Sequence, residues 1–352
     1  MSETNLFLVS TPLHLMVSIA IVDTLQLKDA HIIFIDQVQG RKNPYLETLE
    51  AWPANPFKSV NVFYRPRRKL FEKWKSRRAT FAALATIIEQ LKPVHIYTGN
   101  DRRVEFQFCM HTATQAGYQP KGYYMDEGTF TYVGRKASST FSDRILDNYV
   151  KKLVYGLWWK HPETVGASDW IDSIYVSYPD IAHPLLKKKK LIQLTLAFWQ
   201  SAALLNFCSQ LVDRIGRPKN LSELDLLITL PHESIIVANP AYHEQIKGII
   251  EKQLAEGLRV GVKYHPRDTD PDLLKLGDID GVELLSRQLP FEALLPMVKS
   301  GATVLGDFST TLITTRLLRP DLKARAIDHG NNKNAADFID LYRKIGIDII
   351  KN

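Results

Sequence analysis

The chain has 352 residues, 45% of them hydrophobic and 24% charged, which is the composition of a globular protein of about two domains and not of a disordered one. Its two cysteines, Cys109 and Cys208, argue against a disulfide framework and fit a reducing compartment. The net charge of +7 indicates an anionic partner, such as a nucleotide, a nucleic acid, a phospholipid or an acidic glycan.

The N-terminal segment MSETNLFLVSTPLHLMV is interpreted as the start of a fold. It lacks the basic region and the small-residue cleavage site of a signal peptide. LFLVST predicts a first strand, and we therefore expect a cytoplasmic protein. Further along the chain, much of the positive charge lies in RPRRK (65–69), KWKSRR (73–78) and KKKK (187–190).

Short apolar runs alternate with longer segments of helical periodicity, such as 81–92 and 241–257. In the first half the predicted strands are LFLVST (6–11), HIIFID (31–36), VHIYTG (94–99) and GYYMDE (122–127). In the second half they are DLLITL (225–230), RVGVKYHP (259–266), GVELLS (281–286), ATVLGD (302–307) and ARAID (324–328). Strands that alternate with helices predict parallel sheets, and so an α/β fold of two Rossmann-like domains facing each other across a cleft.

The expected boundaries are a first domain over 1–150, a linker and helical segment over 151–220, and a second domain over 221–352. Within the linker, WIDSIYVSYP (170–179) predicts one more strand. Residues 187–211 begin with lysines and continue largely apolar for a length that could span a bilayer. Four polar residues that are costly in hydrocarbon interrupt the segment: Gln193, Gln200, Asn206 and Gln210. The pattern favours a helix buried between the domains or lying on a membrane or partner surface.

Ligands of open parallel sheets bind beyond the carboxyl ends of the strands. The polar residues that follow each predicted strand are therefore the candidates for a site. In the first half these residues are Thr11, Pro12, Asn100, Asp126, Glu127 and Gly128. In the second half they are Glu233 and the members of the segments VKYHPRD (262–268) and GDFSTT (306–311).

The segment VKYHPRD combines two cations with a histidine. Pro266 keeps His265 extended, and Lys263 and His265, two residues apart, are expected on one face of the strand. Together with Arg267 they could neutralise a phosphate and donate a proton to it. The alternative is a basic strand end exposed to solvent.

In GDFSTT, Gly306 permits a tight turn, and Ser309, Thr310 and Thr311 are expected to open a helix whose N-terminus binds phosphate. The alternative is an ordinary N-cap, which needs one hydroxyl. DTDPD (268–272) resembles the metal-binding DxD of some sugar transferases, but a turn before a helix is favoured. Neither metal-ligand spacing nor a GxGxxG segment is present, so the sequence predicts no metal site and no nicotinamide cofactor.

The pair Asp126 and Glu127 stands directly before Gly128. One carboxylate could take a proton from an acceptor hydroxyl. Neighbouring strand residues point to opposite faces, so only one of the two is expected to face a substrate. The alternative is an acidic turn.

The acidic pair before a glycine, the strand that ends in His-Pro and the later Ser/Thr cluster together resemble the bacterial sialyltransferases. The chain is most similar to the lipooligosaccharide sialyltransferase group, glycosyltransferase family 52, and its polysialyltransferase relatives. NLFLVSTPLHLMVSIAI and DLLITLPHES resemble that family's first strand and the strand ahead of the His-Pro strand. The resemblance covers most of the chain.

The resemblance implies a GT-B fold and an inverting, metal-independent transfer of a sialic acid-type nonulosonic acid from a CMP-sugar, without a cofactor. The implied acceptor is a cell-surface glycan, either lipooligosaccharide or capsule. His265 would act on the CMP phosphate with Lys263 and Arg267, and Ser309, Thr310 and Thr311 would hold the phosphate or the cytidine. Asp126 is the first choice for the general base and Glu127 the second. The loop ahead of the His-Pro strand, with His232 and Glu233, stays open as another source of the base.

An enzyme that extends lipid-linked glycans would lie against the anionic inner face of the cytoplasmic membrane. RPRRK, KWKSRR, Trp158-Trp159 and the 187–211 helix are the candidates for that contact, and the same helix could form a homodimer interface. Two rival functions stay open. One is a GT-B transferase that uses CMP-activated pseudaminic acid, legionaminic acid or Kdo, or a UDP-sugar. The other is a nucleic-acid-binding protein, for which the chain lacks a recognisable RNA module, so that no nucleic acid partner is expected.

Overall fold

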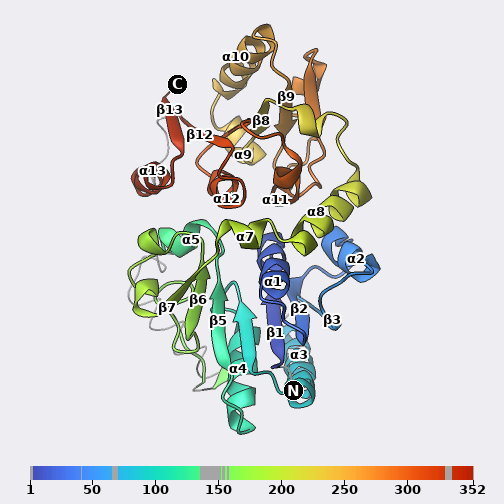
Figure 1. Ribbon diagram of the computed structural model, residues 1–352, viewed down its shortest axis with the longest axis vertical. Helices are drawn as coiled ribbons and strands as arrows, with labels where there is room; N and C mark the ends of the chain where they lie inside the picture. Colours follow the sequence, from blue (N-terminus) through green and yellow to red (C-terminus); the bar gives the residue numbers. More distant parts are fainter. Residues whose placement is uncertain are drawn as a thin grey trace. The chain divides into compact units, whose positions relative to one another are not determined.

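The computed structural model describes residues 3–40, 42–65, 70–134, 152, 155–156, 158–329 and 335–351. The chain forms two compact units, Met1–Leu204 and Leu205–Asn352. Each unit is built on one parallel β-sheet with helices against it (Figure 1). The predicted α/β class with two parallel sheets is therefore confirmed.

The first unit has a seven-stranded sheet in the order β3-β2-β1-β4-β5-β6-β7. The strands are β1 (Asn5–Val9), β2 (Ala30–Gln37), β3 (Ser59–Tyr64), β4 (His95–Thr98), β5 (Lys121–Met125), β6 (Ser173–Val176) and β7 (Lys190–Gln193). β1 is buried along its whole length because it pairs with β2 on one side and β4 on the other. The chain therefore reverses its direction of winding between β1 and β4, and the loops after these two strands flank the switch point where such sheets bind ligands.

The helices of the first unit are α1 (Pro12–Thr24), α2 (Pro44–Ala51), α3 (Leu70–Leu91), α4 (Val104–Gln115), α5 (Thr129–Tyr132) and α7 (Leu196–Trp199). α1 begins directly after β1 because Pro12 suits the first helical position and the Thr11 hydroxyl accepts the N–H of His14 at 3.2 Å. Residues 13–22 of α1 are all buried. α1 packs beside α7, and α3 packs beside α4.

The second unit has a six-stranded sheet in the order β10-β9-β8-β11-β12-β13. The strands are β8 (Leu226–Thr229), β9 (Val260–Lys263), β10 (Val282–Leu285), β11 (Thr303–Gly306), β12 (Lys323–Asp328) and β13 (Asp348–Lys351). The helices are α8 (Ala202–Ile215), which begins in the first unit, α9 (Glu233–Val237), α10 (Tyr242–Ala255), α11 (Phe291–Leu294), α12 (Thr310–Leu318) and α13 (Ala335–Lys344). β8 is central in this sheet, and the switch point lies between β8 and β11.

The division between the two units falls within the segment 151–220, which the sequence marked as a linker. The expected linker 151–220 contributes β6 and β7, which extend the first sheet beyond β5. The division itself falls between Leu204 and Leu205, inside α8.

The continuous helix expected over 187–211 is wrong. The segment instead forms β7, the short helix α7 and the start of α8. β7 pairs with β6, and the N–H of Leu194 still reaches the carbonyl of Val176 at 2.9 Å, so sheet pairing takes residues that a helix would have used. Within the described parts of the chain, no helix combines the length and the apolar character needed to cross a membrane.

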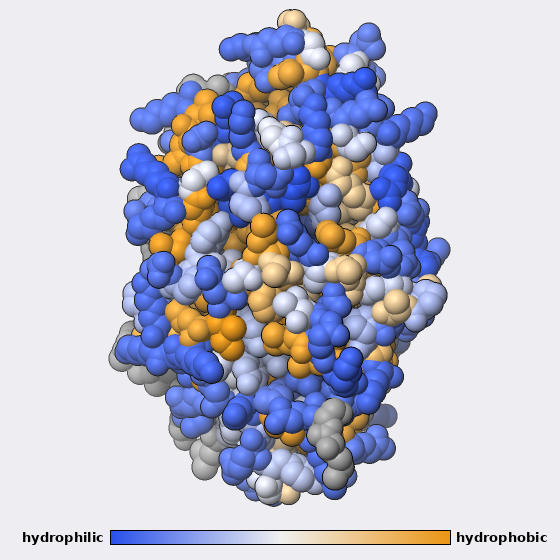
Figure 2. Space-filling model, viewed as in Figure 1, coloured by the Kyte–Doolittle hydropathy of each residue, from blue (hydrophilic) through white to orange (hydrophobic). Residues whose placement is uncertain are grey.

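Residues of two segments that were expected to meet a membrane make contacts within the fold. Trp159 is buried, and Trp158 stacks on His111 of α4 with 5.5 Å between ring centroids. In the lysine run, the ammonium groups of Lys187 and Lys189 donate to the carbonyl oxygens of Asp180 and Ile171. Of RPRRK, residues 66–69 lie outside the described residues. On the face in Figure 2, hydrophilic residues cover most of the surface and apolar residues lie in smaller groups between them.

Candidate active site

In the first unit, a histidine and a carboxylate meet at the carboxyl edge of the sheet. His14, in the first turn of α1, is buried, and its Nε2 lies 3.7 Å from an oxygen of Glu127. On the other side of the ring, Nδ1 lies 3.3 Å from the hydroxyl of Ser10. The ring lies over the end of β4, where a Cβ on Gly99 would come within 2.1 Å of Nε2, so this position requires glycine. Ser10, His14 and Glu127 therefore form one polar cluster.

The neighbouring carboxylate, Asp126, is used by the fold. It is 1% exposed, and its oxygens accept the N–H groups of Gly128 (2.9 Å) and Ser177 (3.1 Å) and the hydroxyl of Tyr132. Burial raises the pKa of the Asp126 carboxyl, while the hydrogen bond from Tyr132 acts in the opposite direction. Asp126 thus joins the ends of β5 and β6 and the start of α5.

The surroundings of Asp126 and Glu127 differ, and this distinguishes two carboxylates whose roles the sequence left open. Glu127 keeps 11% of its side chain exposed and points to His14, whereas the oxygens of Asp126 are already occupied. Glu127 is therefore the carboxylate of the pair that keeps access to solvent. Gly128, with φ of 87° and ψ of −129°, makes the turn that sends the two carboxylates to different surroundings.

The other first-unit candidates shape the strand ends. Thr11 and Pro12 start α1, as described above. Asn100 makes a tight turn in which its side-chain oxygen accepts the N–H of Arg102 at 3.0 Å. The next residue, Asp101, is fully buried and accepts the N–H groups of Gly166 and Ser168, each at 2.8 Å.

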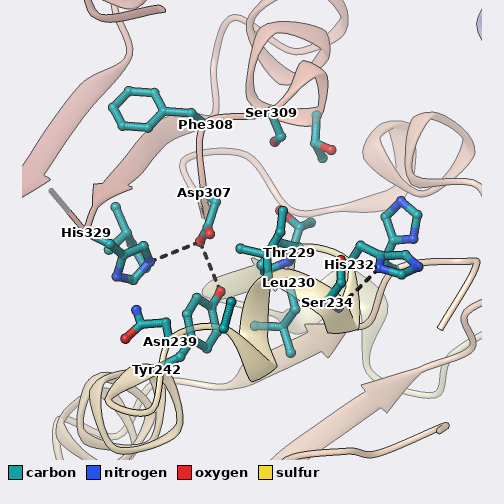
Figure 3. Close-up of a pocket in the computed structure, with 16 residues that line it drawn as sticks. Thr229, Leu230, His232, Ser234, Asn239, Tyr242, Asp307, Phe308, Ser309 and His329 are labelled. Atoms are coloured by element: carbon teal, nitrogen blue, oxygen red, sulfur yellow. Dashed lines mark hydrogen bonds and ion pairs between the residues drawn. The ribbon is translucent and has the colours of Figure 1, made fainter. Parts of the chain in front are cut away.

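In the second unit, the carboxyl ends of β8, β9, β11 and β12 surround a pocket of about 610 Å³ (Figure 3). All of its lining residues lie between Thr229 and His329, within this one unit. At one end, the Asp307 carboxylate accepts the Tyr242 hydroxyl at 3.0 Å and lies 3.3 Å from Nε2 of His329. Asn239 lies beside this group, while His232 and Ser234 lie toward the opposite end.

His265 lies beside His232, at the end of the pocket opposite the Asp307 and His329 group. It follows β9, its side chain is 33% exposed, and its Nδ1 accepts the N–H of Arg267 at 3.2 Å. Burial lowers the pKa of His265 below its usual range, while Asp268 acts against this shift. His232 follows the neighbouring strand β8, and its ring meets that of His265 edge-to-face with 5.2 Å between centroids.

Ser309 and Thr311 line the pocket where α12 begins. Ser309 is the N-cap residue of α12, but its hydroxyl makes no capping hydrogen bond to the helix backbone. Its backbone is held by the Tyr342 hydroxyl, which lies 2.7 Å from the Ser309 nitrogen and 2.8 Å from the Ser309 oxygen. The predicted helix start after GDF is therefore present, and it faces the pocket.

Five second-unit candidates, all among the described residues, do not line this pocket: Glu233, Lys263, Pro266, Arg267 and Thr310. Lys263 is 4% exposed, its ammonium donates to the carbonyl of Arg287 at 3.2 Å, and burial lowers its pKa to about 8. Pro266, Arg267 and Thr310 are exposed. The carboxylate of Glu233 accepts the N–H of Thr269 at 2.8 Å and its hydroxyl at 3.0 Å.

Several pocket residues were not proposed from the sequence, among them Asn239, Tyr242 and His329. His329 stands directly after the predicted strand 324–328, so the rule that selects strand ends would have found it. Asp307 belongs to GDFSTT, which was a candidate segment as a whole. Tyr242 begins α10, and nothing in its local sequence distinguishes it from a core tyrosine.

His232, His265 and Asp268 bring potential metal ligands within 4.8 Å of one another. Hydrogen bonds already occupy much of this donor set. Nδ1 of His232 accepts the N–H of Ser234 and Nδ1 of His265 that of Arg267, both at 3.2 Å. Both oxygens of Asp268 also accept backbone N–H groups. The DTDPD segment is a turn, in which Asp272 accepts from Tyr264, Leu276 and Gly277.

Comparison with solved structures places these two units among known folds. The chain is similar to the alpha/beta-galactoside alpha-2,3-sialyltransferase of Photobacterium phosphoreum, with a TM-score of 0.60 at 13% identity over 99% of this chain and 98% of that one. It is similar to the GT-B domain of the sialyltransferase of Photobacterium damselae, with a TM-score of 0.59 at 10% identity over 99% of both chains. It is also similar to the UDP-GlcNAc 2-epimerase of Methanocaldococcus jannaschii, with a TM-score of 0.57 at 13% identity over 99% of this chain and 89% of that one. These likenesses show a GT-B fold.

A sequence search of curated proteins gives no match. The sequence model of the alpha-2,8-polysialyltransferase family, in contrast, matches residues 5–326, which is nearly the whole chain. This match confirms the resemblance to the bacterial sialyltransferases and their polysialyltransferase relatives. The chain belongs to the alpha-2,8-polysialyltransferase family and is a sialic acid glycosyltransferase.

Proposed function

We propose that the protein transfers a sialic acid-type nonulosonic acid from a CMP-activated donor to a glycan, with inversion and without a metal ion or cofactor. The observation that carries this proposal is the second-unit pocket. It combines hydrogen-bonding groups suited to a nucleoside at one end with two histidines at the other, and α12 begins beside it.

The donor would fill the pocket along its length. Asn239, Asp307 and His329 offer both hydrogen-bond donors and acceptors to the cytidine. The hydroxyls of Ser309 and Thr311 and the N-terminus of α12 suit the phosphate. His265 then faces the phosphate oxygen from which the sugar departs, and it donates a hydrogen bond as negative charge develops there.

The first unit would supply the base. We assign this role to Glu127, assisted by His14, because Glu127 keeps solvent access while Asp126 is held by the fold. Glu127 takes the proton of the acceptor hydroxyl as that oxygen attacks the sugar carbon, and the C–O bond to the phosphate breaks on the opposite side. A single displacement of this kind inverts the configuration at the carbon.

CMP leaves as a monophosphate whose charge His265 and the α12 N-terminus can stabilise, which reduces the need for a divalent cation. Thr310, at the first position of α12, contributes through its backbone N–H. Lys263, Pro266 and Arg267 support the loop of His265, and Glu233 supports it from the side of β8.

We propose a cell-surface glycan of capsule or lipooligosaccharide type as the acceptor, itself ending in sialic acid, as the family name suggests. Its negative charge would suit the net charge of +7. It would also suit an open pocket of about 610 Å³ in the first unit, lined by Arg65 and Lys75 among others. An acceptor on a lipid would bring the enzyme to the inner face of the cytoplasmic membrane, with the cationic α3 as a contact. A homodimer through α7 and α8 remains a further proposal.

The test is a donor assay with purified protein, CMP-Neu5Ac and a sialylated oligosaccharide, with CMP release as the readout. His265→Ala should lower the turnover number by roughly 10²- to 10³-fold, the usual effect of removing one oxyanion donor, with an unchanged circular dichroism spectrum. His243→Ala, in the first turn of α10 and with 45% of its side chain exposed, is the matched control and should leave turnover unchanged. An active His265→Ala variant would refute the leaving-group role.

Calorimetry separates the rival donors. Binding of UDP or GDP without binding of CMP would overturn the proposal in favour of another GT-B enzyme. CMP binding without turnover of CMP-Neu5Ac would point to the pseudaminic acid, legionaminic acid or Kdo donor. Tight RNA binding without CMP binding would favour the nucleic-acid alternative.

A further inference from the structure

Two neighbouring strand ends carry histidines in the same local arrangement. His232 follows β8 and His265 follows β9, and the two strands are adjacent in the sheet. In each case Nδ1 accepts the backbone N–H two residues further on, from Ser234 and from Arg267, at 3.2 Å. Both rings line the 610 Å³ pocket, with 5.2 Å between their centroids.

In both rings Nδ1 is the accepting nitrogen, and that of His232 also lies 2.9 Å from the Ser234 hydroxyl, which can donate to it. A nitrogen that accepts an N–H carries no proton of its own, so the neutral ring holds its proton on Nε2. Nε2 is the outer nitrogen of the side chain, farther from the loop backbone. The pocket therefore receives two N–H donors from closely spaced rings, an arrangement that suits an anion with several acceptor oxygens.

A buried carboxylate holds the two loops together. The side chain of Asp268 is 1% exposed, and its oxygens accept the N–H of Glu233 at 2.9 Å and that of His265 at 3.1 Å. Glu233 completes the link by accepting both the N–H and the hydroxyl of Thr269. One residue from each histidine loop is thus bound to Asp268, so the spacing of the two rings depends on it.

We propose that His232 is a second hydrogen-bond donor to the phosphate of the donor substrate, beside His265, and that Asp268 is the positioning residue for the pair. The inference rests on the proposed function. When the bond between the sugar carbon and the phosphate oxygen breaks, its electron pair stays on that oxygen. Both rings keep their Nε2 protons, and their hydrogen bonds to the phosphate strengthen as the negative charge grows.

A purely structural role for His232 predicts a different outcome, because its side chain also caps α9 through the N–H of Ser234. The variants His232→Asn and His232→Gln separate the two roles. Asparagine can keep the capping acceptor near the position of Nδ1, but it lacks the outer donor. Glutamine can place an amide N–H near the position of Nε2.

The experiment measures kcat and KM for CMP-Neu5Ac, and the affinities for CMP and for cytidine, in the full chain. His232→Asn should lower kcat/KM roughly 10²-fold, the usual effect of removing one oxyanion donor, and should weaken CMP but not cytidine. His232→Gln should recover most of this loss. Wild-type kinetics in His232→Asn, or equal weakening of CMP and cytidine, would overturn the assignment.

Asp268→Asn tests the positioning role, because an amide nitrogen cannot accept the second backbone N–H. The variant should lose kcat/KM with little change in cytidine affinity. Combined with His232→Asn, its effect should be less than multiplicative, because both changes disturb one unit. Independent, multiplicative effects would refute the coupling. If the wild-type protein neither binds CMP nor uses the donor, the proposed function itself is refuted. Results that differ only among the variants bear on the roles of His232 and Asp268 and leave the proposed function standing.

Discussion

Burial gives the two neighbouring carboxylates at the end of β5 different tasks. Asp126 accepts from Gly128, Ser177 and Tyr132, whereas Glu127 faces His14 and keeps solvent access. Glu127→Gln should therefore lower kcat by roughly 10²- to 10⁴-fold, the contribution of a general base, while CMP affinity and stability stay near wild type.

The matched variant Asp126→Asn should do the reverse. An amide can accept fewer of these hydrogen bonds, and the resulting unpaired buried group should cost about 2 kcal/mol of unfolding free energy in urea titrations. Steady-state kinetics on the folded fraction complete the comparison. A stable Asp126→Asn protein that has lost turnover would show that Asp126, and not Glu127, is the base.

Lys263 carries a pH dependence of stability. Burial lowers its pKa from 10.5 to about 8, with Glu292 and Asp268 acting against the shift and Arg287 adding to it. Between pH 8 and 10.5 the unfolded chain binds a proton at this site that the folded protein does not. Stability therefore rises with pH across that window, by about 3 kcal/mol from this group.

The variant Lys263→Met isolates this effect, because methionine fills similar space without the charge. Relative to Lys263→Met, the wild type should gain unfolding free energy from pH 8 to 10.5, as measured by guanidinium titration at each pH. CMP affinity should change little, since Lys263 does not line the pocket. A difference between the two proteins that is constant with pH would contradict the assignment.

Of the residues proposed from the sequence, His265, Ser309 and Thr311 line the pocket, because they lie two to five residues beyond the ends of β9 and β11. The sequence grouped Lys263 with His265 by the alternation of side chains along a strand. That argument failed because β9 ends at Lys263, so His265 already belongs to the following turn. Alternation could likewise indicate that Asp126 and Glu127 face different surroundings, but only the contacts with Ser177 and His14, far away in sequence, decide which is which.

At the level of elements, every predicted strand is present, and the missed strands β3, β7 and β13 share one property. Each lies at the edge of its sheet, paired on one side only. β3 and β7 contain no fully buried residue, and so they lack the continuous apolar run of the central strands. For β7, four lysines followed by an apolar stretch suggested a helix. The periodicity of the segment cannot show that the edge of β6 is available for pairing, and this pairing is what makes the segment a strand.

Two glycines give opposite predictions for the elements that hold them. In β5, a Cβ on Gly122 would lie 1.9 Å from the carbonyl oxygen of Trp170, so Gly122→Ala should lower the stability of the first unit by about 3 kcal/mol. In the middle of α10, Gly248 has no neighbour within 4 Å of such a Cβ, so Gly248→Ala should raise the stability of the second unit by about 1 kcal/mol. Thermal unfolding of both variants tests the pair. Equal effects of the same sign would show that backbone packing at β5 is not the cause.

At the level of the whole molecule, the candidate groups divide between the two units. His14 and Glu127 belong to the first unit, while every residue that lines the pocket at the ends of β8, β9, β11 and β12 belongs to the second. The second unit has its own complete sheet and a buried core that includes Ile228, Val262 and Tyr264. The chemistry of donor binding should therefore be separable from the chemistry of transfer.

A fragment of residues 202–352, which starts with α8, should fold and bind CMP with an affinity within a few-fold of the whole chain, because it keeps all the contacts of the pocket. It should not turn over CMP-Neu5Ac with an acceptor, because it lacks Glu127. Calorimetry with CMP tests the first expectation, and the same fragment carrying His232→Asn and His265→Ala, with a native circular dichroism spectrum, is the control that should bind more weakly. If the folded fragment fails to bind CMP while the whole chain binds it, residues of the first unit must contribute to CMP binding. That result would refute the assignment of donor binding to the second unit alone.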